Sequence, residues 1–138
     1  MSGRDAFLAR LARIERAASA LEGELATLHR AMDATRRLRE RGGTVSEVMT
    51  LSPVPASLEG VAVRLETLVE AIHRYRVETV RSLVDDEGWF LAEVARTMGC
   101  SRQLVSRLYH SSDDARRGAV PRPRIRLRNR HTTLPLPG

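Results

Sequence analysis

Residues 90–109 read FLAEVARTMGCSRQLVSRLY, and this stretch decides how the rest of the chain is interpreted. Its first apolar residues recur at steps of three and four, which places them on one face of a short helix; they are Leu91, Val94, Ala95 and Met98. Gly99 follows at once, and helices often end at a left-handed residue that glycine adopts at low cost. The spacing predicts a helix that ends at this glycine.

A second helix is predicted directly after the turn. Ser101 is a favourable N-cap, and Val105 and Leu108 lie on the face that turns back toward the first helix. Ala95 is small enough for the two helix backbones to approach closely. A small Ala, a Gly four residues later, and Val and Leu on a second helix together resemble the bacterial helix-turn-helix DNA-binding motif.

The resemblance covers about 20 of the 138 residues, and Cys100 occupies a position where the motif usually carries an aliphatic residue. A small buried thiol can satisfy that position. The resemblance implies that the second helix enters the major groove, where Arg can pair with guanine and Gln with adenine. The predicted DNA-binding residues are Ser101, Arg102, Gln103, Ser106, Arg107 and His110. An ordinary solvated face is the alternative, and the basic, acid-free character of these positions favours DNA.

Residues 1–43 form a predicted oligomerisation helix. Their apolar residues alternate steps of four and three, which is the heptad seam of a coiled coil or long bundle helix. The residues of this seam expected to mediate dimerisation are Phe7, Leu11, Ile14, Leu21, Leu25, Leu28 and Met32. Ala18 also lies on the seam. A helix that packs on its own chain has the same periodicity, so both arrangements remain open. Gly42 and Gly43 end the helix.

Residues 44–57 are a predicted connector. Thr44 and Glu47 match a capping box, which predicts one or two helical turns. Pro53 and Pro55 are expected to stop their continuation. We expect the connector to pack on the helices, because it is rich in apolar residues.

Residues 58–110 form a predicted support helix followed by the helix-turn-helix. The support helix is expected to begin with Ser57 as its N-cap and to run to about Val84. Its first half should pair with the N-terminal helix and its second half should underlie the helix-turn-helix. Trp89 and Phe90 are expected to cover the small core of that unit.

Residues 111–138 form a predicted Arg- and Pro-rich tail, largely irregular. Between positions 115 and 138 there are seven Arg residues and no Asp or Glu. Arg-rich arms can follow phosphates or enter the minor groove, so DNA contacts are predicted for Arg122, Arg124, Arg126, Arg128 and Arg130. A disordered tail that adds solubility and weak DNA affinity is the alternative.

Composition favours an all-α fold and a polyanionic partner. Hydrophobic residues make up 42% of the chain but aromatic residues only 4%, which favours helices over sheets. The net charge is +6, and every basic residue is Arg. The single Cys makes no internal disulfide, and no apolar run approaches the roughly 20 residues that span a membrane. Four scattered His residues show no metal-ligand spacing, so neither an enzyme nor a cofactor is expected.

These observations predict a sequence-specific, dimeric bacterial transcription regulator that binds double-stranded DNA, with a cytoplasmic, nucleoid-associated location. A nucleoid or plasmid-maintenance protein that coats DNA with lower specificity is one alternative. A docking module, in which the long helices bind RNA polymerase or another protein, is the other.

Removal of residues 115–138 should weaken binding to all DNA sequences by similar factors. Each lost phosphate contact lowers the slope of log affinity against log salt by about 0.9. Titrations of one duplex at several salt concentrations measure that slope. A slope equal to that of the full chain would show that the tail does not touch DNA.

Overall fold

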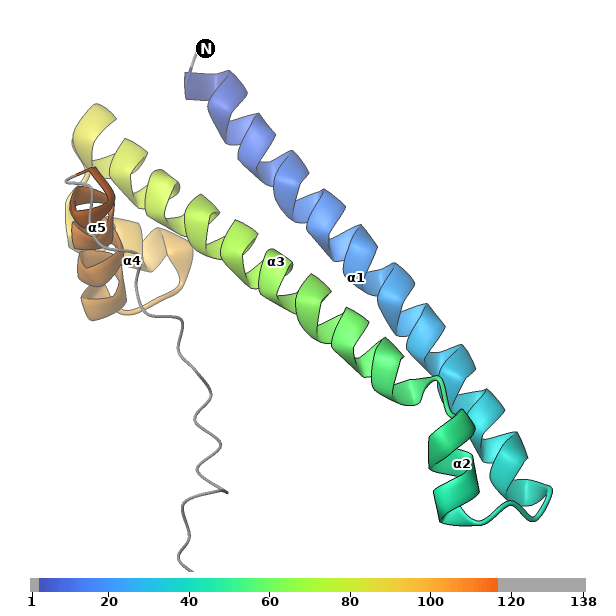
Figure 1. Ribbon diagram of the computed structural model, residues 1–138. Helices are drawn as coiled ribbons and strands as arrows, with labels where there is room; N and C mark the ends of the chain where they lie inside the picture. The colour runs from blue at the N-terminus through green and yellow to red at the C-terminus, as the bar shows by residue number, and fades with distance from the viewer. Residues whose placement is uncertain (1–2, 117–138) are drawn as a thin grey trace, which may run out of the picture.

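The computed structural model describes residues 3–116, in which all regular secondary structure is helical and there is no strand (Figure 1). They form α1 (Gly3–Glu40), α2 (Val45–Leu51), α3 (Val54–Arg81), the π-helical turn η1 (Ser82–Asp86), α4 (Leu91–Met98) and α5 (Arg102–Arg116). The predicted all-α class is confirmed for this part of the chain. Residues 117–138 lie outside the described residues, together with the five tail arginines predicted to contact DNA.

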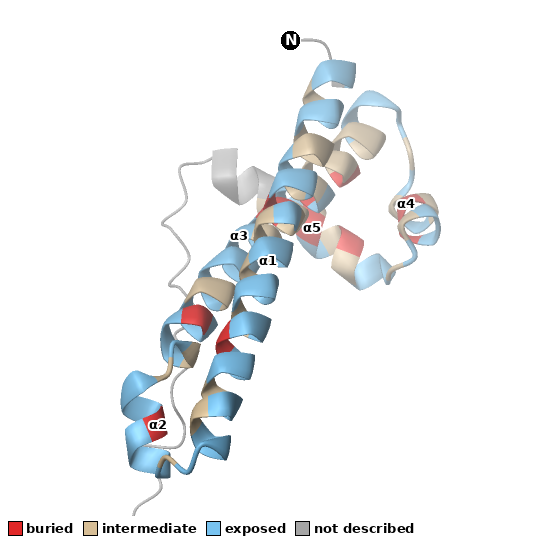
Figure 2. Ribbon diagram, turned by 90° about the vertical axis from the view of Figure 1, so that its right-hand side faces the viewer, coloured by how far each residue is buried: buried red, intermediate tan, exposed pale blue. Residues whose placement is uncertain are grey.

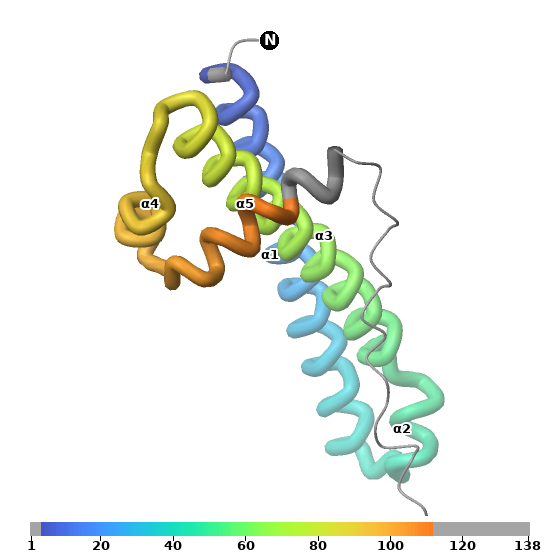
Figure 3. The backbone as a smooth tube through the Cα atoms, turned by 90° about the vertical axis from the view of Figure 1, so that its left-hand side faces the viewer, coloured from blue at the N-terminus to red at the C-terminus, as the bar shows by residue number. Residues whose placement is uncertain are grey.

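Helices α1 and α3 form a long antiparallel hairpin, with α2 at its closed end (Figure 1). At the closed end, the hydroxyl oxygens of Thr35 and Ser52 are 2.8 Å apart. At the open end, the rings of Phe7 and Tyr75 lie 5.8 Å apart. Helices α4 and α5 pack on the C-terminal half of α3, on the side away from α1 (Figures 1 and 3). Helix α3 therefore supports both parts of the molecule.

The contact between α1 and α3 bears on the predicted role of the N-terminal seam. Ala17 and Ala31 are buried, one position before the predicted Ala18 and Met32. In register with these alanines, three large residues of the predicted seam are half-buried and turn toward α3 of the same chain: Ile14, Leu21 and Leu28. Of the two arrangements that the sequence leaves open, packing within the same chain is the one present for this part of the seam. Small alanines bring the two helix axes close together, and this decides which face turns inward.

The remaining residues of the seam stay on the flank of the hairpin. Exposure is 37% for Phe7, 39% for Leu25 and 44% for Met32. Figure 2 shows the few buried residues of the hairpin between α1 and α3, with most of the outer surface exposed. The hairpin thus leaves a substantial part of its apolar surface in contact with solvent.

The predicted connector is confirmed at its N-terminal end, but α3 begins before the predicted C-terminal end of the connector. The capping box is present: the Glu47 N–H donates to the Thr44 hydroxyl over 3.1 Å, and the Thr44 N–H donates to the Glu47 carboxylate over 3.3 Å. However, α3 begins at Val54, so Ser57 is a buried residue inside the helix and not its N-cap. Pro53 lies at the N-cap of α3 and Pro55 in its first turn. Backbone N–H groups at these positions have no partner within the helix, so a proline without an N–H group fits there.

The C-terminal half of α3 contributes to a second core. Val77 and Val80 pack with residues of α4 and α5, namely Val94, Ala95, Val105 and Leu108. Trp89 packs against this cluster as predicted, whereas Phe90 is 75% exposed. Phe90 occupies the N-cap of α4 in an extended conformation, outside the helical face that carries Val94. The prediction that Phe90 covers the core is therefore wrong.

The C-terminal helix is longer than the sequence predicted. Helix α5 continues to Arg116, through residues 111–114, which were predicted to begin the largely irregular tail. Those residues carry no Pro or Gly, so nothing in the backbone chemistry ends the helix there.

Substitution Leu108→Ala should lower the free energy of unfolding by about 2–5 kcal/mol, because it opens a cavity in the core of α3, α4 and α5. Phe90→Ala removes a larger side chain from an exposed position and should cost no more than about 0.5 kcal/mol. Urea unfolding followed by circular dichroism measures both. Equal losses would show that Phe90 belongs to the core.

Candidate nucleic-acid interface

The turn between α4 and α5 sets the angle between these two helices. Gly99 ends α4 in the left-handed conformation, with φ 68° and ψ 34°. The N–H of Cys100 donates to the carbonyl of Ala95 over 3.0 Å, and the N–H of Gly99 donates to the carbonyl of Arg96 over 3.3 Å. This pair of bonds is the Schellman arrangement, which satisfies carbonyls left over at a helix end. The predicted role of Gly99 is confirmed.

Ser101 starts α5. Its hydroxyl accepts a hydrogen bond from the N–H of Leu104 over 3.1 Å, and its carbonyl accepts one from the N–H of Val105 over 3.1 Å. The predicted capping role of Ser101 is confirmed. Because the cap and the turn are adjacent, the first residues of α5 are held in a defined position relative to α4.

The core determines which side of α5 faces outward. Val105 is fully buried and Leu108 is 5% exposed, so this side of α5 is turned into the protein. Among the predicted DNA-binding residues of α5, Ser106 is half-buried. The others are exposed: Arg102, Gln103, Arg107 and His110. The structure thus brings the predicted residues together on one helix, and none of them except Ser101 contributes to its packing or capping.

The outward face of α5 carries two exposed arginines, Arg102 and Arg107. Among the described residues, the ion pairs lie on α1, α3 and η1 or between α1 and α3, and none involves Arg102 or Arg107. Asp85 of η1 accepts a hydrogen bond from the Tyr109 hydroxyl over 2.8 Å and lies 3.8 Å from the guanidinium of Arg81. This carboxylate is therefore engaged with other groups.

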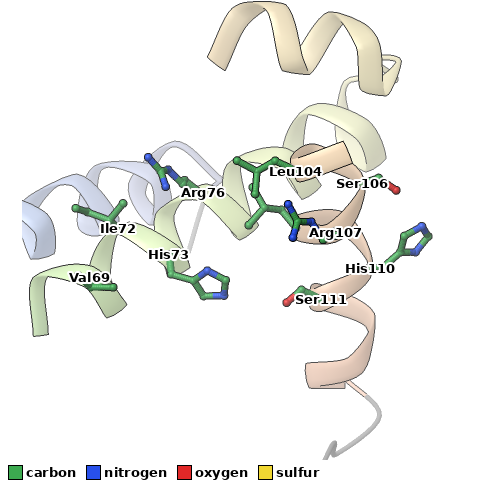
Figure 4. Close-up of a pocket in the computed structure, with 10 residues that line it drawn as sticks. Val69, Ile72, His73, Arg76, Leu104, Ser106, Arg107, His110 and Ser111 are labelled. Carbon is green, nitrogen blue, oxygen red and sulfur yellow. The ribbon is translucent and has the colours of Figure 1, made fainter. Parts of the chain in front are cut away.

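A groove between α3 and α5 adds residues that the sequence did not indicate (Figure 4). It is lined on α3 by Val69, Ile72, His73 and Arg76, and on α5 by residues that include Leu104 and Arg107. Figure 4 shows Arg107 and Ser111 on the side of α5 nearer α3, with Ser106 and His110 at the opposite edge. Arg76 therefore lines the same groove as Arg107, from the α3 side. Which residues surround Arg76 depends on how α5 crosses α3, and no pattern of neighbouring residues in the sequence predicts that crossing.

Groups suited to catalysis do not gather in the described residues. No cluster of three or more His, Cys, Asp or Glu side chains could hold a metal ion there. Cys100 is half-buried and packs against the core of α3, α4 and α5. No helix among residues 3–116 is both long enough and apolar enough to cross a membrane.

No protein family, curated protein or solved structure matches this chain. Its function is therefore inferred from the geometry and chemistry of α4, α5 and the surfaces beside them.

Substitution Ser101→Ala should lower the free energy of unfolding by about 1 kcal/mol, because the N–H of Leu104 loses its partner. Ser106→Ala is the matched control, since Ser106 is half-buried and lies inside the helix, where Ala is the better helix former. Thermal or urea unfolding compares the two variants. A Ser101→Ala protein as stable as the Ser106→Ala protein would contradict the capping role.

Proposed function

We propose that this chain is a sequence-specific DNA-binding protein, a bacterial transcription regulator that reads the major groove with α5. The observation that carries the proposal is the outward face of α5, which is basic and free of ion pairs within the described residues. A helix held by its cap and its core can present such a face without reorganisation on binding, which lowers the entropic cost of association.

Arg102 and Gln103 are the proposed base-reading residues. Both lie in the first turn of α5, directly after the Ser101 cap. In the recognition geometry of helix-turn-helix proteins, the N-terminal residues of the second helix contact base edges. An Arg donates two hydrogen bonds to O6 and N7 of guanine, and a Gln amide matches N6 and N7 of adenine. Ser106 lies one turn further along and extends the same readout.

The flanking residues are proposed to hold phosphates. Arg107 lies on the α3 side of α5 and His110 at its outer edge, with Arg76 across the groove on α3. Ser101 lies at the N-terminus of α5, where the free backbone N–H groups and the helix dipole favour an anion. Such contacts orient the helix and contribute affinity that falls with salt, but they carry no sequence information.

Two measurements separate this proposal from its alternatives. Binding to random duplex DNA that weakens steeply with salt is expected for a DNA-binding protein and not for a docking module on RNA polymerase. Specific binding is typically about 10³–10⁷ times tighter than nonspecific binding. A specificity ratio near one would instead favour the nucleoid or plasmid-maintenance protein that coats DNA.

Arg102→Ala and Gln103→Ala should each relax base preference at one base pair per half-site, by about 1–3 kcal/mol of discrimination. The site is first selected from random DNA, and each variant is then titrated with that site and with its single-base-pair variants. Both variants should fold normally, because Ala is a good helix former and both positions are exposed.

Arg37→Ala serves as the charge-matched control, because Arg37 is exposed on α1, far along the chain from α5. It should retain the full base preference of the unmodified protein. If Arg102→Ala and Gln103→Ala also retain it at every position, α5 does not read DNA and the docking alternative becomes the better account.

A further inference from the structure

Helix α3 carries a second apolar row in addition to the one that faces α1. This outer strip consists of Leu58, Ala62, Leu65, Val69 and Ile72, which recur at steps of four and three. Leu58 is 53% exposed, Leu65 is 47% exposed and Val69 is 57% exposed. The inner row is marked by the buried Ser57 and Ala71. One helix face therefore packs on α1, and another apolar face is exposed at Leu58, Ala62 and Leu65 and meets α5 only at its C-terminal end.

Helix α1 continues this apolar surface on the same side of the hairpin. The inner row of α1 faces α3 and includes the buried Ala17 and Ala31. One position after this row, apolar residues recur every seven residues; they are Leu11, Ala18, Leu25 and Met32. On α3, three residues likewise lie one position after the row that faces α1: Leu58, Leu65 and Ile72. In an antiparallel helix pair, equivalent flanking positions of the two helices lie on the same side of the pair. The outer strip and the α1 row thus form one face.

A two-helix hairpin cannot bury this face by itself. Each helix has one apolar row turned inward, and among residues 3–116 the flanking rows meet another helix only toward their ends, where Met32 lies beside α2 and Ile72 beside α5. Contiguous exposed apolar patches of this kind mark interaction sites in soluble proteins. The face also runs into the groove between α3 and α5, whose lining includes Val69, Ile72 and Leu104.

We propose that a second copy of this chain covers the outer strip, with the two α3 helices antiparallel and the two-fold axis close to Leu65. The spacing of the strip supports a symmetric partner. Pairing about Leu65 places it opposite its own copy and Leu58 opposite Ile72 of the other copy, each seven residues from the axis. Ala62 and Val69 lie three and four residues from the axis, so they come within one residue of facing each other. A two-fold interface requires such reciprocity, in which residue i meets j and j meets i. Each Leu58 would then lie at the α3–α5 groove of the other copy.

The face is close in size to the smallest stable interfaces. The apolar row of α1 runs from Leu11 to Met32, about 32 Å of helix at 1.5 Å per residue. The outer strip runs from Leu58 to Ile72, about 21 Å, and two rows each about 10 Å wide give a face of about 530 Å² on each copy. Stable interfaces bury about 800 Å² per partner, with a lower end near 600 Å². The result is a four-helix arrangement in which each copy contributes α1 and α3.

The same geometry sets the distance between the two reading helices, a consequence that rests on the proposed DNA-binding function. Val105 of α5 shares a core with Val77 and Val80, which lie 12 and 15 residues beyond Leu65. At 1.5 Å per residue, each α5 sits about 20 Å from the axis along α3, and the two lie about 40 Å apart. Successive major grooves on one side of DNA are about 34–36 Å apart. The selected site should therefore contain two half-sites about one turn apart.

Analytical ultracentrifugation of the full chain at micromolar concentrations, without DNA, tests the dimer directly. The unmodified protein should sediment as a dimer. Leu65→Asp places two charges at the axis and should weaken dimerisation by about a hundredfold or more. Val63→Asp is the matched control, because Val63 is 54% exposed on the same helix but lies off the strip. A monomeric unmodified protein, or equal loss in both variants, would overturn the proposal.

Cross-linking tests the register even if Leu65→Asp fails to fold. In a Cys100→Ala background, oxidation of Leu65→Cys should join two copies, because this residue faces itself across the axis. Leu58→Cys should not cross-link with itself, but should do so in a mixture with Ile72→Cys. Failure of Leu65→Cys to cross-link would refute the register. Because neither experiment contains DNA, a dimer that does not bind DNA would refute the proposed function and leave this inference intact.

Discussion

The contact among Val80, Val94 and Val105 holds the C-terminal part of the molecule together, and the exposure of the basic face depends on it. These three side chains come from α3, α4 and α5 and are the largest that are fully buried. Burial of one such side chain stabilises a protein by about 1.5–3 kcal/mol. The β-branched Val side chain also has few rotamers, which limits the number of ways in which the three helices can pack together. With Val105 in this contact, Gln103 faces away from the core and Arg102 lies at its edge, and both are exposed.

Helix α3 transmits this constraint to the rest of the chain. Its inner row packs on α1, its C-terminal end packs on α4 and α5, and its outer strip remains largely exposed. Gly60 illustrates how closely the first of these contacts is made: a Cβ atom there would lie 2.7 Å from a carboxylate oxygen of Glu24. That carboxylate also pairs with Arg64 at 3.8 Å. A single helix with three surfaces therefore links the proposed dimer face to the proposed reading helix.

Local chemistry made much of the second half of the chain predictable. The end of α4 at Gly99, the cap at Ser101 and the inward positions of Val105 and Leu108 all follow from requirements of single residues. The capping box of α2 is similar, since Thr44 and Glu47 satisfy each other across four residues. By contrast, Ser57 has good N-cap chemistry but lies inside α3, because Pro53 and Pro55 suit the first turn of a helix at least as well.

The sequence by itself determined the helical class, the two apolar periodicities, the turn at Gly99 and the set of polar residues on α5. Each of these depends on residues within one or two helical turns of one another. Tertiary structure decided which row of each long helix is used. A heptad pattern is equally compatible with a partner from the same chain or from another copy, and only the close fit of Ala17 and Ala31 against α3 selects the row. The position of Arg76 in the same groove as Arg107 was likewise decided by the crossing of α5 over α3, because those residues are separated in the chain and share a groove only when both cores have formed.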